Sequence, residues 1–131
     1  FLVDEDSNAF DRIISSFKLP NNSEEEKKIR LKAIYDSSIY AAEVPLRVMN
    51  RSYDSYKLIF ELAKNGNQNS ISDAGVACLC IHAAIYGAYL NVKINLKDIS
   101  NDQGILKKAD QIIKKSSLLI YIISRCLISL T

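Results

Sequence analysis

The stretch NGNQNSISDAGVACLCIHAAIYGAYLNVKINLKD, residues 65–98, decides the fold. Its start, Asn65-Gly66, predicts the end of one helix, because glycine can take the left-handed conformation that closes a helix. Ser72 then predicts an N-cap, with Asp73 in the first turn beside the positive end of the helix dipole. We therefore expect a helix from Ser72 to about Leu96, around which the rest of the chain is organised.

This expected helix is unusually slim. Its small residues are Ala74, Gly75, Ala77, Ala83, Ala84, Gly87 and Ala88. A helix with so few large side chains lets another backbone or a flat ligand approach closely. Asn91 and Asn95 follow one turn apart on one face, so this face is a candidate binding site.

The composition indicates one all-α domain. A chain of 131 residues is long enough to bury a core, and its hydrophobic fraction of 48% is that of a globular protein. Four glycines and two prolines are few for a fold made of turns and strands. No alternating apolar pattern persists, so we expect a bundle of about five helices.

Neither a nucleic acid nor a membrane is expected as a partner. The net charge is only +2 and the basic residues are scattered, which does not predict a nucleic-acid surface. Residues 118–130 are strongly apolar, but they are too few to span a membrane and include Arg125. A buried or inter-subunit helix is the better interpretation of that segment.

The cysteines and the histidine do not predict a metal site. Cys78 and Cys80 would point about 200° apart on a helix and cannot bind one metal ion together. Three cysteines are an odd number, so free thiols in a reducing, cytoplasmic compartment are expected. His82 is the single histidine, and a packed or surface position is its preferred interpretation. The sequence also lacks a Ser–His–Asp set, a P-loop and a dinucleotide fingerprint.

A first helix is expected from Val3 to Phe17, where apolar residues recur at helical spacing. Asp6 lies on this apolar stripe, between Val3 and Phe10. A carboxylate among apolar side chains either has a raised pKa or needs a partner, which makes Asp6 a candidate catalytic group. An equal alternative is that Asp6 caps or pairs within the first helical turn.

Three further helices are expected around these two. One begins at the capping box Ser23–Glu26 and should end or kink near Ala41, because Pro45 cannot supply a helical N–H. The next is expected over residues 45–64, and the last over residues 103–130.

Five blocks of sequence resemble a known family in the same order. The blocks are VDEDSNAF (Val3–Phe10), KLP (Lys18–Pro20), AAEVPL (Ala41–Leu46), NQNSISD (Asn67–Asp73) and GAYLNVKINLKDI (Gly87–Ile99). Together they resemble the cyclodeaminase/cyclohydrolase family of folate one-carbon metabolism over roughly Leu2 to Asp102. This family includes the C-terminal domain of formimidoyltransferase-cyclodeaminase and stand-alone bacterial methenyltetrahydrofolate cyclohydrolases.

The resemblance implies an all-helical fold, a homodimer or higher homo-oligomer, and a folate substrate, with a formimidoyltransferase, fused or separate, as a further partner. It also implies that the second aspartate of a D-x-D-x-x-A-F motif is catalytic, and that residue is Asp6 here. Family members carry a further N-terminal helical region with a PGGGS-like segment, which this sequence does not contain. We therefore interpret residues 1–131 as a single, N-terminally truncated domain.

The reaction expected from this resemblance closes formimino-tetrahydrofolate to methenyl-tetrahydrofolate and releases ammonia. The leaving nitrogen must gain a proton and N10 must lose one, so a carboxyl group such as Asp6 can shuttle the proton. Hydrolysis of the methenyl ring needs similar groups, which makes a cyclohydrolase the first alternative. A non-catalytic helical assembly module is the second. Neither reaction calls for a metal, a nucleotide or a redox cofactor.

Six further residues are candidates for substrate binding. Asp73, Asn91 and Asn95 are candidates for hydrogen bonds to the pterin or to the reacting nitrogens, and their alternative is to cap or bridge helices. The candidate counter-charges for the folate glutamate, each of which has a solvated surface position as its alternative, are Lys18, Lys93 and Lys97.

Overall fold

The structure is a computed structural model, and it describes residues 2–128. The described chain consists of α1 (Leu2–Phe17), α2 (Glu24–Asn65), the short 3₁₀ helix η1 (Gln68–Ser70), α3 (Ile71–Asn95) and α4 (Ile105–Ile128). The prediction of an all-α fold is confirmed. The predicted number of helices is wrong, because four α-helices are present instead of five.

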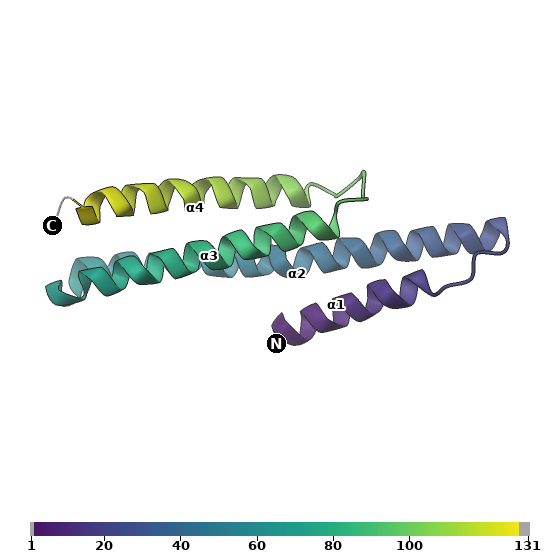
Figure 1. The fold of residues 1–131 in the computed structure, drawn as a ribbon, viewed down its shortest axis with the longest axis horizontal. Helices are drawn as coiled ribbons and strands as arrows, with labels where there is room; N and C mark the ends of the chain where they lie inside the picture. The colour runs from purple at the N-terminus through teal and green to yellow at the C-terminus, as the bar shows by residue number, and fades with distance from the viewer. Residues whose placement is uncertain (1, 129–131) are drawn as a thin grey trace.

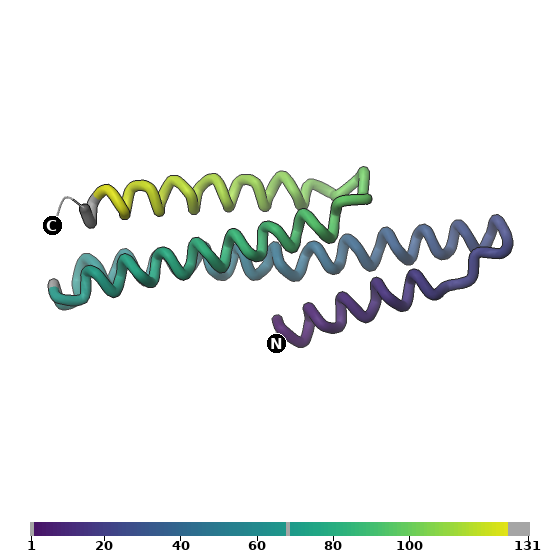
Figure 2. Tube along the Cα trace, viewed as in Figure 1, coloured from purple at the N-terminus to yellow at the C-terminus, as the bar shows by residue number. Residues whose placement is uncertain are grey.

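The four helices form an elongated bundle in which α2 is the common neighbour (Figure 1). The chain reverses at each connection, so that α1 runs antiparallel to α2, α2 to α3 and α3 to α4 (Figure 2). The short α1 covers only the N-terminal half of α2, where Ser16 Oγ and Ser37 Oγ lie 3.2 Å apart in a buried hydrogen bond. The other half of α2 packs on α3 and α4.

α2 continues through Pro45, so the predicted end of a helix near Ala41 is wrong, and the two helices expected on either side of Pro45 are one element. The predicted capping box is confirmed at its start: Ser23 Oγ accepts from Glu26 N–H, and Glu26 Oε2 accepts from Ser23 N–H. A proline inside a helix costs ~3 kcal/mol or more. Pro45 lies in a buried segment with Val44 on one side, and we attribute the continuity of the helix to this packing.

The turn between α2 and α3 forms where the sequence predicts it, but for a different reason. α2 ends at Asn65 as expected, yet Gly66 is extended, with φ −84° and ψ −174°, instead of left-handed. Glycine is required because a Cβ at this position would overlap the carbonyl oxygen of Leu62. α3 begins at Ile71, and Ser70 occupies the N-cap position without a side-chain hydrogen bond, so the predicted cap at Ser72 is also wrong.

α4 begins two residues later than expected, because Asp102 caps it. Its carboxylate accepts from the backbone N–H groups of Gly104 and Leu106, each at 3.0 Å. Gly104 has a φ of +75°, a conformation that favours glycine. The predicted end of this helix at residue 130 lies outside the described residues.

The main core lies between α2, α3 and α4. Its buried residues are Ile39, Ala42, Leu46, Met49, Tyr56, Cys78, Ile85, Ala88, Val92, Leu96, Ile105 and Ala109. A polar network crosses this core: Ser116 Oγ lies 2.9 Å from Tyr56 Oη and 2.7 Å from His82 Nδ1. His82 is thus packed against the core, which is one of the two positions expected for it. A smaller cluster of Ala9, Ala41 and Val44 joins α1 to α2.

α3 exposes an apolar strip that no described residue covers. We call it the outer face of α3, and it consists of Val76, Leu79, Ala83, Tyr86, Leu90 and Ile94. The small residues of α3 lie in two environments, because Gly75 and Ala88 are buried whereas Gly87 is exposed. α3 is long and apolar enough to cross a membrane by length and composition alone, and core helices of soluble proteins meet the same two criteria. The described part of α4 does not meet them.

Candidate functional site

Asp6, Asn91 and Asn95 line one hollow between α1, α2 and α3, although 85 or more residues separate Asp6 from the two asparagines. Its volume is about 130 Å³, and the small side chains of Ala9 and Ala41 contribute to its wall. A second hollow of about 240 Å³ shares Asp6 and Asn91 with the first. We call the two hollows together the Asp6 cleft. Three of the seven residues that the sequence singles out therefore meet at one place.

Asp6 is exposed, so the predicted burial of its carboxylate in an apolar seam is wrong. The physical reason is that its neighbours on the stripe are uncovered: Val3 is 78% exposed and Phe10 is 63% exposed. Within residues 2–128 the Asp6 carboxylate forms no hydrogen bond or ion pair, whereas the adjacent Glu5 pairs with Arg47 of α2. That ion pair holds this end of α1 against α2 and leaves the Asp6 carboxylate open to a ligand.

The two asparagines differ in their surroundings. Asn95 is partly buried at the C-terminal end of α3, and its Nδ2 donates to the carbonyl oxygen of Ala41 at 2.9 Å. Asn91 lies one turn earlier, is exposed, and lines both hollows of the Asp6 cleft. Among the described residues, none forms a hydrogen bond with the Asn91 side chain, whereas Nδ2 of Asn95 is bound to α2 and its Oδ1 has no donor.

The other candidate residues do not line the cleft. Asp73 is exposed at the opposite end of α3, about 27 Å from Asn91 along the helix axis. Lys18 is exposed just beyond the C-terminal end of α1. Lys93 Nζ lies 5.6 Å from the centre of the Tyr89 ring. The role of these residues in binding stays a prediction.

Lys97, the remaining candidate, is exposed just after α3 and lies 3.9 Å from the carboxylate of its neighbour Asp98. An exposed pair of this kind contributes little to stability. Pro45 was not expected at the site, yet it lines the second hollow together with Val44 and Val48. The signal that would have found it is its position within an apolar helical stretch.

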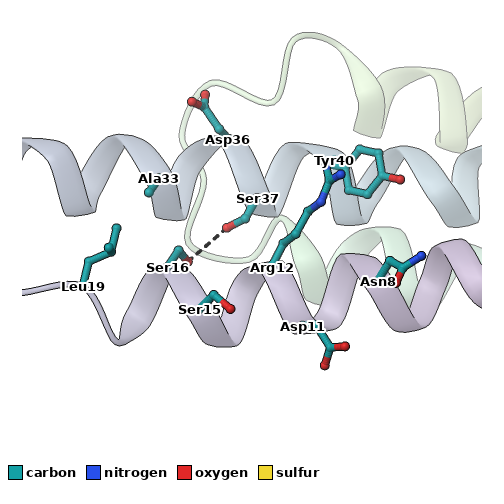
Figure 3. A pocket seen from close by; sticks show the side chains of 10 residues that line it. All are labelled: Asn8, Asp11, Arg12, Ser15, Ser16, Leu19, Ala33, Asp36, Ser37 and Tyr40. Atoms are coloured by element: carbon teal, nitrogen blue, oxygen red, sulfur yellow. Dashed lines mark hydrogen bonds between the residues drawn. The ribbon is translucent and has the colours of Figure 1, made fainter.

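A larger hollow of about 790 Å³ lies between α1 and α2 on another side (Figure 3). None of the candidate residues lines it. Arg12 covers the Tyr40 ring at 4.4 Å, and Asp11 and Asp36 point away from each other at its edges. Its two converging polar groups, the hydroxyls of Ser16 and Ser37, are hydrogen-bonded to each other, and none of the candidate residues lies there, so its size does not make it the functional site.

The Asp6 cleft offers a carboxylate and two amides, a set suited to proton transfer and hydrogen bonding. Among the described residues no three histidine, cysteine or acidic side chains come together in a way that could hold a metal ion. Cys78 is a buried free thiol, and its burial raises its pKa, which disfavours the nucleophilic thiolate.

The family model of formiminotransferase-cyclodeaminase matches residues 1–115. This chain belongs to that family. It is 38% identical to formimidoyltransferase-cyclodeaminase from Rattus norvegicus over 101 residues, which are 77% of this chain and 19% of the rat protein. It is 36% identical to methenyltetrahydrofolate cyclohydrolase from Methylorubrum extorquens over 100 residues, which are 76% of this chain and 48% of the bacterial protein.

The fold agrees with this assignment. The crystal structure of formiminotetrahydrofolate cyclodeaminase from Thermotoga maritima superposes with a TM-score of 0.70 and 26% sequence identity, over 97% of this chain and 62% of that protein. The resemblance seen in the five sequence blocks is thus confirmed. The chain spans about a fifth of the length of the mammalian relatives and about half that of the bacterial cyclohydrolase.

Proposed function

We propose that this chain closes 5-formimino-tetrahydrofolate to 5,10-methenyl-tetrahydrofolate and releases ammonia. The observation that carries the proposal is the meeting of Asp6 with Asn91 in one cleft between α1 and α3. Asp6 comes from the VDEDSNAF block and Asn91 from the GAYLNVKINLKDI block, so two separate parts of the family pattern converge in space. The cyclodeaminases among the relatives support the same reaction.

In the proposed mechanism Asp6 moves one proton between two nitrogens of the substrate. N10 attacks the formimino carbon and forms the new carbon–nitrogen bond, and the Asp6 carboxylate takes the proton from N10. The resulting carboxylic acid gives that proton to the former imino nitrogen. A further proton from solvent converts this nitrogen into ammonia, which leaves as the methenyl cation forms. The exposure of Asp6 allows this exchange with solvent, and such a shuttle contributes ~10²–10⁴-fold.

Hydrolysis of 5,10-methenyl-tetrahydrofolate is the second candidate, and the bacterial cyclohydrolase among the relatives favours it. In that reaction Asp6 takes a proton from the water that attacks the methenyl carbon. It then gives that proton to N5 as the bond between N5 and the carbon breaks, which leaves a formyl group on N10 and releases the hydroxyl proton to solvent. Both reactions need an accessible carboxylate and neither needs a metal or redox cofactor. The two candidates therefore share the Asp6 cleft and differ in the nucleophile and in the carbon–nitrogen bond that breaks.

The assembly that we infer is a homo-oligomer in which a second copy covers the outer face of α3. Contiguous apolar surface of this kind marks an interaction site. The two hollows hold about 130 and 240 Å³, and a small-molecule site typically holds ~300–1,000 Å³. A neighbouring subunit that packs beside Asn91 would enlarge the enclosed space. The described free thiols Cys78 and Cys80 support a reducing compartment such as the cytoplasm.

The remaining candidate residues have roles that we propose from their charge. Lys93 and Lys97 would attract the glutamate carboxylates of the folate, since they lie on the same end of α3 as the cleft. Lys18 and Asp73 would contribute only through a neighbouring subunit. A formimidoyl transfer to tetrahydrofolate would supply the substrate, so we propose a formimidoyltransferase as a functional partner, in keeping with the names of the relatives.

Asp6→Asn tests the proposal, with Asp11→Asn as the matched control on the same exposed helix. Near-ultraviolet absorbance follows methenyl-tetrahydrofolate, and a coupled assay follows ammonia. We expect Asp6→Asn to lower kcat by ~10²–10⁴-fold and to change the free energy of unfolding by less than ~0.5 kcal/mol. Retained turnover in Asp6→Asn would exclude the proton shuttle. An inactive wild-type protein with both folates would favour the non-catalytic assembly module.

A further inference from the structure

Pro45 leaves one carbonyl group of α2 without its helical partner. In an α-helix the N–H of residue 45 would donate to the carbonyl oxygen of Ala41, and proline has no N–H. Ala41 is only 3% exposed, so water has little access to replace the lost donor. Asn95 supplies that donor from α3: its Nδ2 lies 2.9 Å from the Ala41 oxygen.

This contact fixes which end of the Asn95 amide faces α2. A carbonyl oxygen carries no proton, so only the NH₂ group of Asn95 can face it at hydrogen-bond distance. The oxygen Oδ1 must then point the other way. No residue within 2–128 donates to Oδ1, and this oxygen is not buried away from solvent. Asn95 also lines the hollow that contains Asp6, so a ligand there can reach this oxygen.

We propose that Asn95 determines specificity by holding Oδ1 as a fixed hydrogen-bond acceptor for an N–H group of the bound tetrahydrofolate. The inference rests on the proposed function for the identity of the ligand. Tetrahydrofolates carry N–H donors on the pterin ring and, in the formimino compound, at the reacting nitrogens. The contact with Ala41 fixes the orientation of the amide, so that Oδ1 is held on the side away from α2 as an acceptor before the ligand binds.

Pro45 is the positioning residue in this arrangement. Because Pro45 removes the competing donor, the Ala41 carbonyl is free to bind the Asn95 amide. The role of Asn95 in satisfying the carbonyl can therefore be separated from its role toward the ligand. Replacement of Pro45 by alanine returns a backbone N–H to Ala41 and leaves the Asn95 position unchanged.

The test is a cycle of four proteins: wild type, Asn95→Ala, Pro45→Ala and the double variant. Each is measured for its melting temperature, its affinity for tetrahydrofolate by calorimetry, and kcat and KM with formimino-tetrahydrofolate. We expect Asn95→Ala to lower the melting temperature and to weaken tetrahydrofolate binding about three- to tenfold, as loss of one neutral hydrogen bond does. KM should rise by the same factor while kcat stays within about twofold.

The double variant decides between the two roles of Asn95. We expect the loss of melting temperature caused by Asn95→Ala to shrink by at least half in the Pro45→Ala background, while the three- to tenfold loss of affinity persists. Recovery of affinity together with stability would overturn the proposal, because Asn95 would then act only on the Ala41 carbonyl. If Asn95→Ala lowers the melting temperature equally in both backgrounds, the Ala41 carbonyl does not hold the Asn95 amide, and the proposal is overturned.

Failure of the proposed function gives a different pattern. If wild-type protein neither binds tetrahydrofolate nor turns over the formimino compound, the ligand assignment falls and with it the acceptor role of Asn95. The melting temperatures of the four proteins still report on the anchoring contact in that case. If Asn95→Ala alone fails to fold, the double variant, in which Ala41 has a donor again, supplies the affinity measurement.

Discussion

Substitution of Ser116 by alanine should destabilise the protein far more than the size of the change suggests. Ser116 is 0% exposed and connects three helices. Its hydroxyl on α4 lies 2.9 Å from Tyr56 Oη of α2 and 2.7 Å from His82 Nδ1 of α3. One small side chain therefore satisfies two polar groups in the core.

The magnitude follows from the groups that lose their partner. Two hydrogen bonds are lost, each with a net contribution of ~0.5–1.5 kcal/mol. Tyr56 is only 2% exposed, so its hydroxyl would remain in the core without a partner, at a cost of ~1–3 kcal/mol. His82 is less buried and can turn to solvent. We expect Ser116→Ala to lower the free energy of unfolding by ~2–4 kcal/mol, a large share of the ~5–15 kcal/mol of a typical domain.

Urea unfolding followed by circular dichroism measures this loss. Ser117→Ala is the matched control, because Ser117 is exposed and adjacent on α4, and its effect should stay within ~0.5 kcal/mol. In a Tyr56→Phe background no hydroxyl is left without a partner, so Ser116→Ala should cost at least ~1 kcal/mol less there. The reasoning is refuted if Ser116→Ala matches wild type within ~0.5 kcal/mol, or if its cost is the same in both backgrounds.

Two further predictions concern α3. The Tyr89 hydroxyl donates to Asp110 Oδ1 at 2.7 Å, and this hydrogen bond and, to a smaller extent, burial raise the Tyr89 pKa. The stability that this pair contributes is therefore present below about pH 10 and is lost as the pH rises above that value. Urea titrations should show wild type more stable than Tyr89→Phe at pH 8, with the difference shrinking above pH 10; a constant difference would contradict this. Leu79→Glu on the outer face of α3 should convert a dimer to a monomer in sedimentation experiments, whereas Gln111→Glu on α4 should not, and a wild-type monomer would exclude this interface.

Local sequence features predict most of the helical structure. Apolar spacing predicts α1, the capping box predicts the start of α2, and Asn65-Gly66 predicts its end. These signals depend on residues within one or two turns of each other, which is why they can be read without the fold. The one-turn separation of Asn91 and Asn95 likewise places both on one face of α3.

The same local rules fail where packing between helices decides the outcome. Pro45 predicts a break, yet it lies in a buried segment of a continuous helix, and Asn95 from α3 satisfies the carbonyl that it leaves open. The apolar stripe of α1 predicts a buried Asp6, but α2 and α3 leave that side of α1 largely exposed, with Val3 and Phe10 uncovered. Both outcomes depend on which helix lies opposite, and the spacing along one helix does not contain that information.

The sequence by itself determined the family, the all-α class and the residue types of the site, because these depend on ordered motifs and helical periodicity. Only the tertiary structure decided that Asp6 meets Asn91 and Asn95 while Asp73 lies at the other end of α3. It also decided that Ser116 joins three helices through residues 34 and 60 positions away. The physical reason is that helix pairing brings distant residues together, and the polar groups that meet there must then satisfy one another.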